Sequence, residues 1–512
     1  MPILTAIDVL GVQRFTFLSN RLKDIVAGSW LVHWSTSVQD GALSGALKGN
    51  KQNIILASGG NAILEFEDLE SAKNFASQYT KSLYKEAPGL EVILVHYEYS
   101  SGGLATALIK LQKELAKAKI APPVSAPLLG LSVTATCRET GLSANGFASD
   151  DFNAPLSREI LKRREKMKEA NSRWAEFLQN PNLEFPLELD DLGRSIGDTS
   201  LIGIVHIDGN GVGAKIQEWL ENQEGEPDEK VRQRYREWSK ALDDLGHKAF
   251  EAVVKRVLKA LSINNDSPQI NGYPDELSFK LKKRKQKIQL PLRPIILGGD
   301  DLTFVCDGRL ALDLAATALK VFREEEIPHL GKITASAGVA LVKVHDPFSR
   351  AYRLCEDLCS NAKRRLKEEE DFVESDCAID WHIGLPHPSE TLENIRNSLY
   401  RLDRYELTGR PYFLNQGAKV RTWDWFEREL LNFLRTSTWK EHRNKVKKLL
   451  ELAHEGPEEM ERKLKTWKAV FPQLKLPSEI ETNGFFGGRT PLVDAVELLD
   501  IHLALDQMEE QV

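Results

Sequence analysis

The sequence lacks the features that mark membrane and secreted proteins. None of its 512 residues belongs to a run approaching the roughly 18 consecutive apolar residues of a membrane helix. The opening MPILTAIDVLGVQRF has no basic stretch followed by an apolar core, so we expect no secretory signal. The five cysteines are scattered and odd in number, which favours unpaired thiols in a reducing compartment. These absences predict a cytoplasmic protein without membrane association.

A strong excess of charge of one sign is also missing. The formal net charge of −7 is small for this length, so the surface as a whole is not built to bind phosphate backbones. One local exception is the basic segment 280–287, KLKKRKQK, which could contact RNA. It has no interleaved aromatic residues that would stack bases, and a solvated loop is the preferred interpretation.

Cysteine spacing offers one candidate metal pair. Cys355 and Cys359 lie one helical turn apart and would be able to share a metal ion. Both fall on the apolar stripe of a predicted helix, however, and free cysteine is among the most frequently buried residues. Core packing is therefore the preferred interpretation, with metal binding as the alternative.

Apolar sequence is present in amounts that support several folded domains. Hydrophobic residues make up 42% of the chain, and its length corresponds to about three or four domains. Residues 1–105 follow the order β-α-β-β-α-β of a ferredoxin-like fold, beginning with the strand LTAIDVLGVQRF. Their central hairpin is predicted to turn at Ser58-Gly59-Gly60-Asn61.

The same order recurs further along the chain. Residues 201–410 begin with the strand LIGIVHID and carry the hairpin PIILGGDDLTFVCDG, so the sequence contains two diverged copies of one unit. The region 106–200 between them is predicted to be mostly helical, with REILKRREKMKEANSRWAEFLQ as a solvated connecting helix. Residues 411–512 are predicted to form a separate helical domain. The expected fold class is α+β.

The strand LIGIVHID ends in a carboxylate, Asp208, that is suited to binding a ligand. A glycine-rich turn follows, composed of Gly209, Asn210, Gly211, Val212 and Gly213. Glycine lets the backbone approach a ligand closely, and the amides of the next helix favour an anion such as a triphosphate. This turn is therefore predicted to bind a nucleotide. A plain strand-to-helix turn with an aspartate cap is the alternative.

The hairpin tip Gly298-Gly299-Asp300-Asp301 is the strongest local signal. Two adjacent aspartates in a mostly buried hairpin repel each other and resist desolvation. A hard divalent cation removes both problems, because Mg²⁺ takes carboxylate and phosphate oxygens as ligands. We therefore predict a metal site here, with Gly298 and Gly299 close to the nucleotide. An ordinary hairpin turn is the alternative for this tetrapeptide alone.

The strand end at Asp208 and the GGDD turn together indicate one metal site more strongly than either does alone. In a β-α-β-β fold the first strand lies beside the hairpin, so Asp208 is expected to meet the GGDD turn. The predicted ligands of two Mg²⁺ or Mn²⁺ ions, about 3.5–4 Å apart, are Asp208, Gly209, Asp300 and Asp301. Such ions activate a 3′-hydroxyl and neutralise a leaving pyrophosphate. Lys363, at the rim of a buried helical stripe, is predicted to reach phosphate oxygens, with a solvated lysine as the alternative.

These motifs resemble those of a known family. VHIDGNGVG, RPIILGGDDLTFVCDG, ITASAGVALV and CEDLCSNAKRRLK, in this order, resemble the second palm domain of the large subunit of type III CRISPR complexes. That palm is related to the GGDEF cyclases and to the class III nucleotide cyclases. The opening VLGVQRF and SNRLKDIVAGSWLVHW resemble the first palm of the same family.

The resemblance carries definite expectations. It implies two ferredoxin-like palm domains plus helical domains, and synthesis of cyclic oligoadenylates from ATP as an antiviral signal. It implies RNA or CRISPR-type effector subunits as partners. It also implies that the aspartates Asp208, Asp300 and Asp301 bind metal and that Lys363 binds phosphate.

The sequence departs from the family pattern at three points. The His-Asp pair His345-Asp346 follows a palm strand and is expected to be a surface turn, so no HD nuclease domain is expected. Cys137 stands alone where the family often has a zinc-binding pair, so we expect no structural zinc. Asn61 occupies the place of a metal-binding aspartate. The first palm is therefore expected to be inactive and to hold an acceptor nucleotide through ASGGNAILEF and GVQRF.

Two other functions are also compatible with the sequence. A dinucleotide cyclase of the GGDEF kind would share the metal site but would need two active palms from two chains, and hence a homo-oligomer. A scaffold subunit would bind RNA or proteins through an inactive palm. The combination of Asp208 with the GGDD turn argues against the scaffold.

Overall fold

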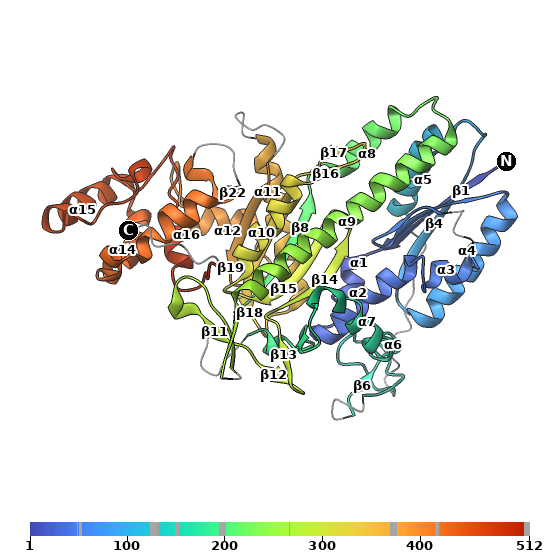
Figure 1. The fold of residues 1–512 in the computed structure, drawn as a ribbon, viewed down its shortest axis with the longest axis horizontal. Coiled ribbons are helices and arrows are strands. Elements are labelled where there is room, and N and C mark those ends of the chain that lie inside the picture. Colours follow the sequence, from blue (N-terminus) through green and yellow to red (C-terminus); the bar gives the residue numbers. More distant parts are fainter. Residues whose placement is uncertain are drawn as a thin grey trace.

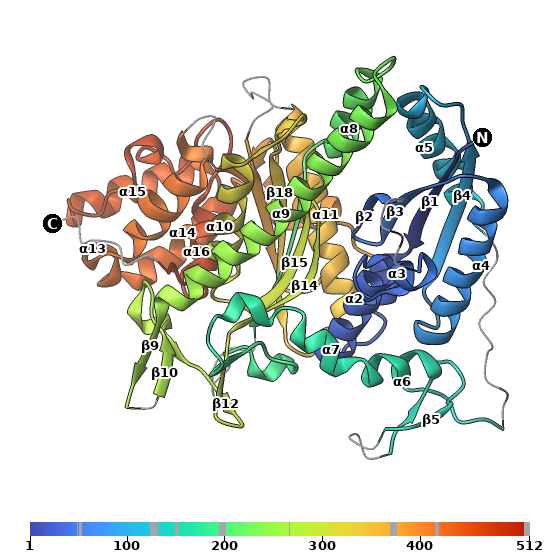
Figure 2. The same ribbon diagram turned by 45° about the vertical axis from the view of Figure 1, so that its right-hand side comes forward.

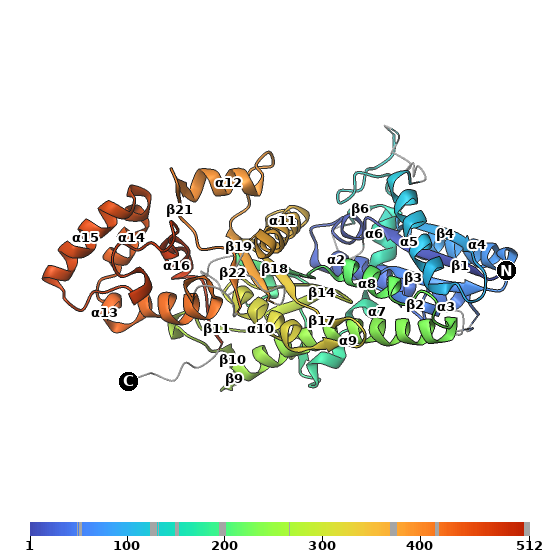
Figure 3. The same cartoon turned by 90° about the horizontal axis from the view of Figure 1, so that it is seen from above.

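The computed structural model describes residues 1–48, 50, 54–122, 131, 133–148, 153–193, 201–265, 267–368, 376–414 and 419–505. The chain is elongated, with the N-terminal sheet at one end, a larger sheet in the middle and the last helices at the other end (Figures 1 and 3). The long helix α9 (Asp228–Ala260) runs from the middle of the molecule toward the N-terminal sheet (Figure 2).

The N-terminal sheet has the predicted ferredoxin-like order, β2-β3-β1-β4, with antiparallel neighbours. Its strands are β1 (Ile3–Leu10), β2 (Ile54–Ser58), β3 (Asn61–Phe66) and β4 (Glu91–Glu98). Its helices are α1 (Val12–Thr16), α2 (Leu22–Thr36), α3 (Ala42–Ala46) and α4 (Leu69–Glu86). One part of the prediction is wrong. GVQRF does not extend the first strand, because Gly11 adopts a left-handed conformation (φ 57°) that ends the strand and starts α1.

The connecting region is less uniform than predicted. Its helices are α5 (Leu104–Ile120), α6 (Arg158–Glu165) and α7 (Met167–Ser172), followed by the 3₁₀ turn η2 (Ala175–Leu178). Its short strands are β5 (Gly146–Phe147), β6 (Pro155–Leu156) and β7 (Leu183–Glu184). The prediction of one solvated helix over 158–179 is wrong, since Arg163 is fully buried. Its guanidinium donates hydrogen bonds to the carbonyl oxygens of Phe15 and Thr16, which ties the connector to the N-terminal domain.

The central sheet repeats the first topology. In the described part of the chain its order is β14-β15-β8-β18-β19-β22. The strands are β8 (Leu201–Gly209), β14 (Leu292–Gly298), β15 (Asp301–Asp307), β18 (Ala335–Lys343), β19 (Ala378–Ile383) and β22 (Tyr412–Phe413). The first four strands in this order correspond one for one to β2-β3-β1-β4. Besides α9, the helices are α8 (Val212–Glu221), α10 (Ala311–Glu324) and α11 (Phe348–Glu368). The last strand of this sheet, β22, lies inside the range 411–512 that was predicted to form a separate C-terminal helical domain.

Smaller elements surround this sheet. The basic segment 280–287 is not a plain loop. It contributes to the short strands β11 (Phe279–Lys280), β12 (Lys283–Arg284) and β13 (Lys287–Gln289). Further short strands are β9 (Leu261–Asn264), β10 (Ser267–Ile270), β16 (Glu326–Ile327), β17 (Gly331–Lys332), β20 (Arg401–Leu402) and β21 (Tyr405–Glu406). The C-terminal helices are α12 (Leu392–Leu399), α13 (Ser437–Lys440), α14 (Arg443–Glu455), α15 (Pro457–Val470) and α16 (Leu492–Leu498).

The cysteines of α11 pack in the core. The Cys355 and Cys359 thiols are buried and donate to the carbonyl oxygens of Ile204 and Ser336. Burial raises the pKa of the Cys355 thiol well above its ordinary value and that of the Cys359 thiol to about 12, so both remain protonated and are poor metal ligands. Among the helices that the structure describes, none combines the length and apolar character needed to cross a membrane.

Candidate functional site

The two predicted halves of the site meet at one edge of the central sheet. Strand β15 pairs with β8 so that Leu302 lies opposite Ile207, which places Asp301 beside Asp208. Gly209 has no room for a side chain, because a Cβ there would lie 2.7 Å from the Asp300 Oδ2 atom. The glycine is needed for the approach of the GGDD hairpin, whereas the sequence suggested the approach of a ligand.

Lys363 closes this edge from helix α11. Its ammonium group donates to the Asp208 carboxylate and, at 2.7 Å, to the Gly209 carbonyl oxygen. These are two of the four predicted metal ligands. The lysine therefore lies at the predicted site, where it supplies positive charge to these oxygens. Its contact with phosphate remains a prediction.

The two hairpin aspartates have different surroundings. Burial, and then the neighbouring Asp208 charge, raise the pKa of Asp300 to about 6. Asp301 lies 3.4 Å from Nδ1 of the buried His206, and it accepts a 3.4 Å hydrogen bond from the Thr303 hydroxyl. Burial opposes the charge on His206, yet the Asp301 carboxylate raises the pKa of this histidine overall. No sequence pattern indicated that His206 would lie beneath the hairpin.

The turn after β8 serves mainly to hold the edge together. The Asn210 amide donates to the Thr334 hydroxyl at 3.0 Å and accepts from the Ser336 hydroxyl at 2.9 Å. Gly211 is left-handed (φ 66°) and starts α8. A Cβ at Gly213 would meet nothing within 4 Å, so that glycine leaves open space at the helix start. The Asn210 side chain therefore holds the turn against neighbouring residues of the sheet edge. Nucleotide binding by Val212 and the turn glycines stays a prediction.

The tips of the two central hairpins touch. A Cβ at Gly298 would lie 3.2 Å from the Gly59 Cα atom, so the GGDD tip rests directly on the corresponding tip of the first domain. Asp243 of α9 joins them, because its Oδ1 atom accepts from the Ser58 hydroxyl at 2.7 Å and from the Gly299 backbone amide at 3.2 Å. One carboxylate therefore fixes the position of both tips.

Helix α9 also approaches the GGDD tip closely. Gly246 is buried and lies one turn along the helix from Asp243. A Cβ at Gly246 would lie 2.8 Å from the Gly299 carbonyl oxygen. Glycine is unfavourable inside a helix, so its presence here is explained by the need to admit the hairpin.

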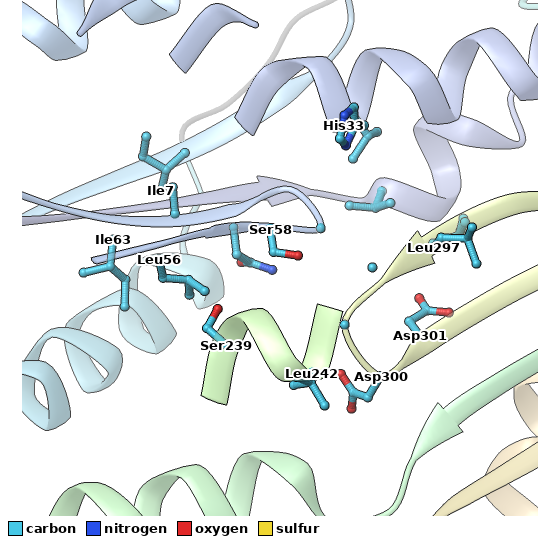
Figure 4. Close-up of a pocket in the computed structure, with 18 of the residues that line it drawn as sticks. Ile7, His33, Leu56, Ser58, Ile63, Ser239, Leu242, Leu297, Asp300 and Asp301 are labelled. Carbon is cyan, nitrogen blue, oxygen red and sulfur yellow. The ribbon is translucent and has the colours of Figure 1, made fainter. Parts of the chain in front are cut away.

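A cavity of about 490 Å³ lies between the two domains and ends at the hairpin tips. Ser58 comes from the first hairpin, His33 from α2, and Ser239 and Leu242 from α9, while Asp300 and Asp301 border it from the other side (Figure 4). The segments predicted to hold an acceptor do line this cavity. The contributing residues from them are Val12, Gln13, Ser58, Gly59, Asn61, Ala62 and Ile63.

The first domain preserves a counterpart of the Asp208–Lys363 pair. Asp8 lies opposite Asn61 in the β1–β3 register, as Asp208 lies beside Asp301 in the second domain. The Asp8 carboxylate is paired with the ammonium group of Lys119 on α5, the first helix after the fourth strand. This pair was not predicted, although the match of AIDVLGV with HIDGNGV was a usable signal, because each aspartate lies three residues before a left-handed glycine.

The donor set fits a hard divalent cation in part. Asp208, Asp300 and the Gly209 carbonyl supply the oxygen ligands that Mg²⁺ prefers, and the raised pKa of Asp300 reflects negative charge that a cation would neutralise. Asp301 instead faces His206. Within the described ranges no group of three or more His, Cys, Asp or Glu side chains is arranged to hold a metal ion. Metal binding, and Asp301 as a ligand, remain predictions.

The raised pKa of Asp300 leads to a testable effect on stability. In the unfolded chain this carboxyl has a pKa of about 3.8, and in the folded chain of about 6. The folded state therefore binds the proton more tightly, and stability falls as the pH rises from about 4 to about 6. Asp300→Asn removes this loss, so we expect the variant to be more stable than the wild type by about 3 kcal/mol above pH ~6 and equal to it below pH ~4.

Urea denaturation in EDTA across this pH range measures the difference. Asp301→Asn is the matched control, because that carboxylate is balanced by His206 and its removal should give no gain. An Asp300→Asn variant that is less stable than the wild type at neutral pH would contradict the electrostatic account.

The fold and this edge define a palm domain of the nucleotide cyclase and polymerase type. Residues 201–371 match the family described as Cas10/Cmr2, second palm domain. This match confirms the resemblance to the type III CRISPR large subunit over the second palm. No curated protein matches the sequence.

Solved structures of Csm1 extend the likeness to the whole chain. Csm1 from T. onnurineus superposes with a TM-score of 0.54 at 14% identity, over 98% of this chain and 70% of the other. A Csm1-Csm4 cassette in complex with AMPPNP gives 0.55 at 13% identity, over 99% and 70%. A cassette in complex with pppApA gives 0.53 at 14% identity, over 98% and 69%. At these identities the likeness establishes the α+β fold with two palms.

Proposed function

We propose that this chain is a nucleotidyltransferase that joins ATP molecules into a cyclic oligoadenylate signal for antiviral defence. The observation that carries the proposal is the cavity between the two palms, which ends at the GGDD hairpin of the second palm. The related Csm1-Csm4 cassettes have been solved with cA4, cA3 and pppApA, which supports this class of product.

Each part of the proposed reaction has a candidate residue in this chain. Asp208, Asp300 and the Gly209 carbonyl would hold the metal ions, and Lys363 would shift from Asp208 to the triphosphate of the donor ATP. Bound Mg²⁺ would lower the pKa of the attacking 3′-hydroxyl and neutralise the leaving pyrophosphate. The helix amides after Gly211 add further positive potential for phosphate.

The first palm would hold the acceptor. Much of the rate of such a reaction comes from placing the 3′-hydroxyl next to the donor phosphate. Asp243 fixes the two hairpin tips against each other, so a nucleotide bound by the first hairpin would lie next to the second hairpin. Because one chain supplies both walls of the cavity, this arrangement favours joining within one chain over a GGDEF-type dinucleotide cyclase built from two.

Product analysis tests the proposal. The purified chain is incubated with each labelled NTP and with Mg²⁺ or Mn²⁺, alone and with RNA and effector subunits, and the products are identified by mass spectrometry. We expect 3′–5′ linked adenylates from ATP, ending in cyclic forms. Cyclic dinucleotides would favour the GGDEF-type alternative. Absence of any joined nucleotide under all conditions, with ATP bound, would favour a scaffold.

A further inference from the structure

One cationic side chain stands out in the cavity between the palms. Among the described residues that line this cavity, the charged ones are Arg173, Asp300 and Asp301. Arg173 thus supplies the single permanent positive charge among the described lining residues. It comes from the connecting region, just after α7, and belongs to neither palm.

The guanidinium of Arg173 is held in place without being neutralised. Its Cζ atom lies 3.7 Å from the centre of the Trp174 ring, so the planar group stacks on a buried aromatic face. Within the described part of the chain, its side chain has no hydrogen-bond or ion-pair partner. Stacking fixes the plane while leaving the N–H donors available.

Nearby protein groups do not compensate this charge. Asp243 is the main source of electrostatic attraction, but its Oδ1 atom already accepts hydrogen bonds from Ser58 and Gly299. Burial lowers the pKa of Arg173 to about 9 and outweighs the attraction of Asp243 and Glu176, although the side chain keeps part of its surface exposed to solvent. Arg173 also helps to lower the pKa of His33 to about 3, after burial, so that histidine is neutral in the same cavity.

We infer that Arg173 is a phosphate-binding residue of the cavity, where its free N–H groups take a phosphate of the nucleotide that lies between the palms. A planar guanidinium with unused donors matches two phosphate oxygens at once. Such an anchor lies apart from Lys363, which is not among the residues that line the cavity. The inference rests on the proposed function, because it assigns a residue to the same nucleotide site.

Calorimetric titration of the full chain tests this role. The probes are inorganic tripolyphosphate and a non-hydrolysable ATP analogue, each with Mg²⁺. We expect Arg173→Gln to weaken both affinities roughly tenfold or more, since a hydrogen bond to a charged group is lost. Arg173→Lys keeps the positive charge but loses the planar guanidinium with its paired N–H donors. We expect its affinity to be within roughly threefold of the wild type. Arg158→Gln is the control, because that arginine also stacks on an aromatic ring, Tyr84, but lies outside the cavity.

The outcomes separate this inference from the proposed function. Unchanged affinity in Arg173→Gln, or equal losses in Arg173→Gln and Arg173→Lys, would overturn the phosphate contact and leave product synthesis untouched. A wild-type chain that makes no product but binds tripolyphosphate through Arg173 would overturn the proposed function alone. A wild-type chain that binds neither probe would overturn the phosphate-binding role as well.

Discussion

Asp208→Asn is expected to reduce the joining of nucleotides by at least about 1,000-fold, which corresponds to about 4 kcal/mol of transition-state stabilisation. The residue is the second-last of β8, lies beside the GGDD hairpin, and is the carboxylate predicted to contact both ions. An amide keeps the shape but removes the charge that holds a cation. The fold should persist, because the Asp208 side chain is 41% exposed and its ion pair with Lys363 is worth no more than about 1 kcal/mol.

The first palm offers a matched control for this change. Asp8→Asn removes the same kind of lysine-paired aspartate from the corresponding strand end of the first palm. Because Asn61 stands beside it in place of a second carboxylate, we expect activity to fall no more than a few-fold. Initial rates of product formation, with urea denaturation of each variant, measure both effects. Equal losses in the two variants would assign the effect to the ion pairs and would remove Asp208 from the catalytic set.

The repeated topology was predictable because it depends on local signals. Alternating apolar residues, glycine-rich turns and helical stripes occur in the same order twice, and the sheets follow from the known pairing of that order. The meeting of Asp208 with the GGDD turn follows from the same rule. The end of the first strand was misplaced, since apolar residues continue past it to Val12 and Phe15, and only the left-handed Gly11 separates strand from helix.

Features that depend on packing between domains were not predictable in this way. Arg163 appears in a highly charged segment, REILKRRE, and nothing in its composition indicates burial against the carbonyl oxygens of the first palm. The same holds for Asp301, whose orientation is set by His206 on the neighbouring strand. Arg173 lines the cavity only because the connector folds back against both palms. In each case the sequence supplies the side chain and the tertiary contact supplies its role.

Gly246→Ala is expected to lower the rate of nucleotide joining about 100-fold, because a misplacement of about 1 Å can have an effect of that size. The new Cβ would lie 2.8 Å from the Gly299 carbonyl oxygen, which is closer than the two atoms can approach. Helix α9 is 33 residues long and packs against the central sheet, so the GGDD tip is the part that must move. The tip carries both aspartates and is also held by Asp243. Its displacement would alter the cation site and the end of the cavity together.

Stability distinguishes this effect from damage to the fold. Alanine inside a helix is favoured over glycine by about 0.8–1 kcal/mol, which offsets part of the strain, so the unfolding free energy of Gly246→Ala should stay within about 1 kcal/mol of the wild type. Gly45→Ala in α3 is the control, because a Cβ there meets nothing within 4 Å and activity should be unchanged. A Gly246→Ala variant with full activity would contradict this prediction. It would show that the hairpin tolerates displacement and that its contact with α9 does not align the reacting groups.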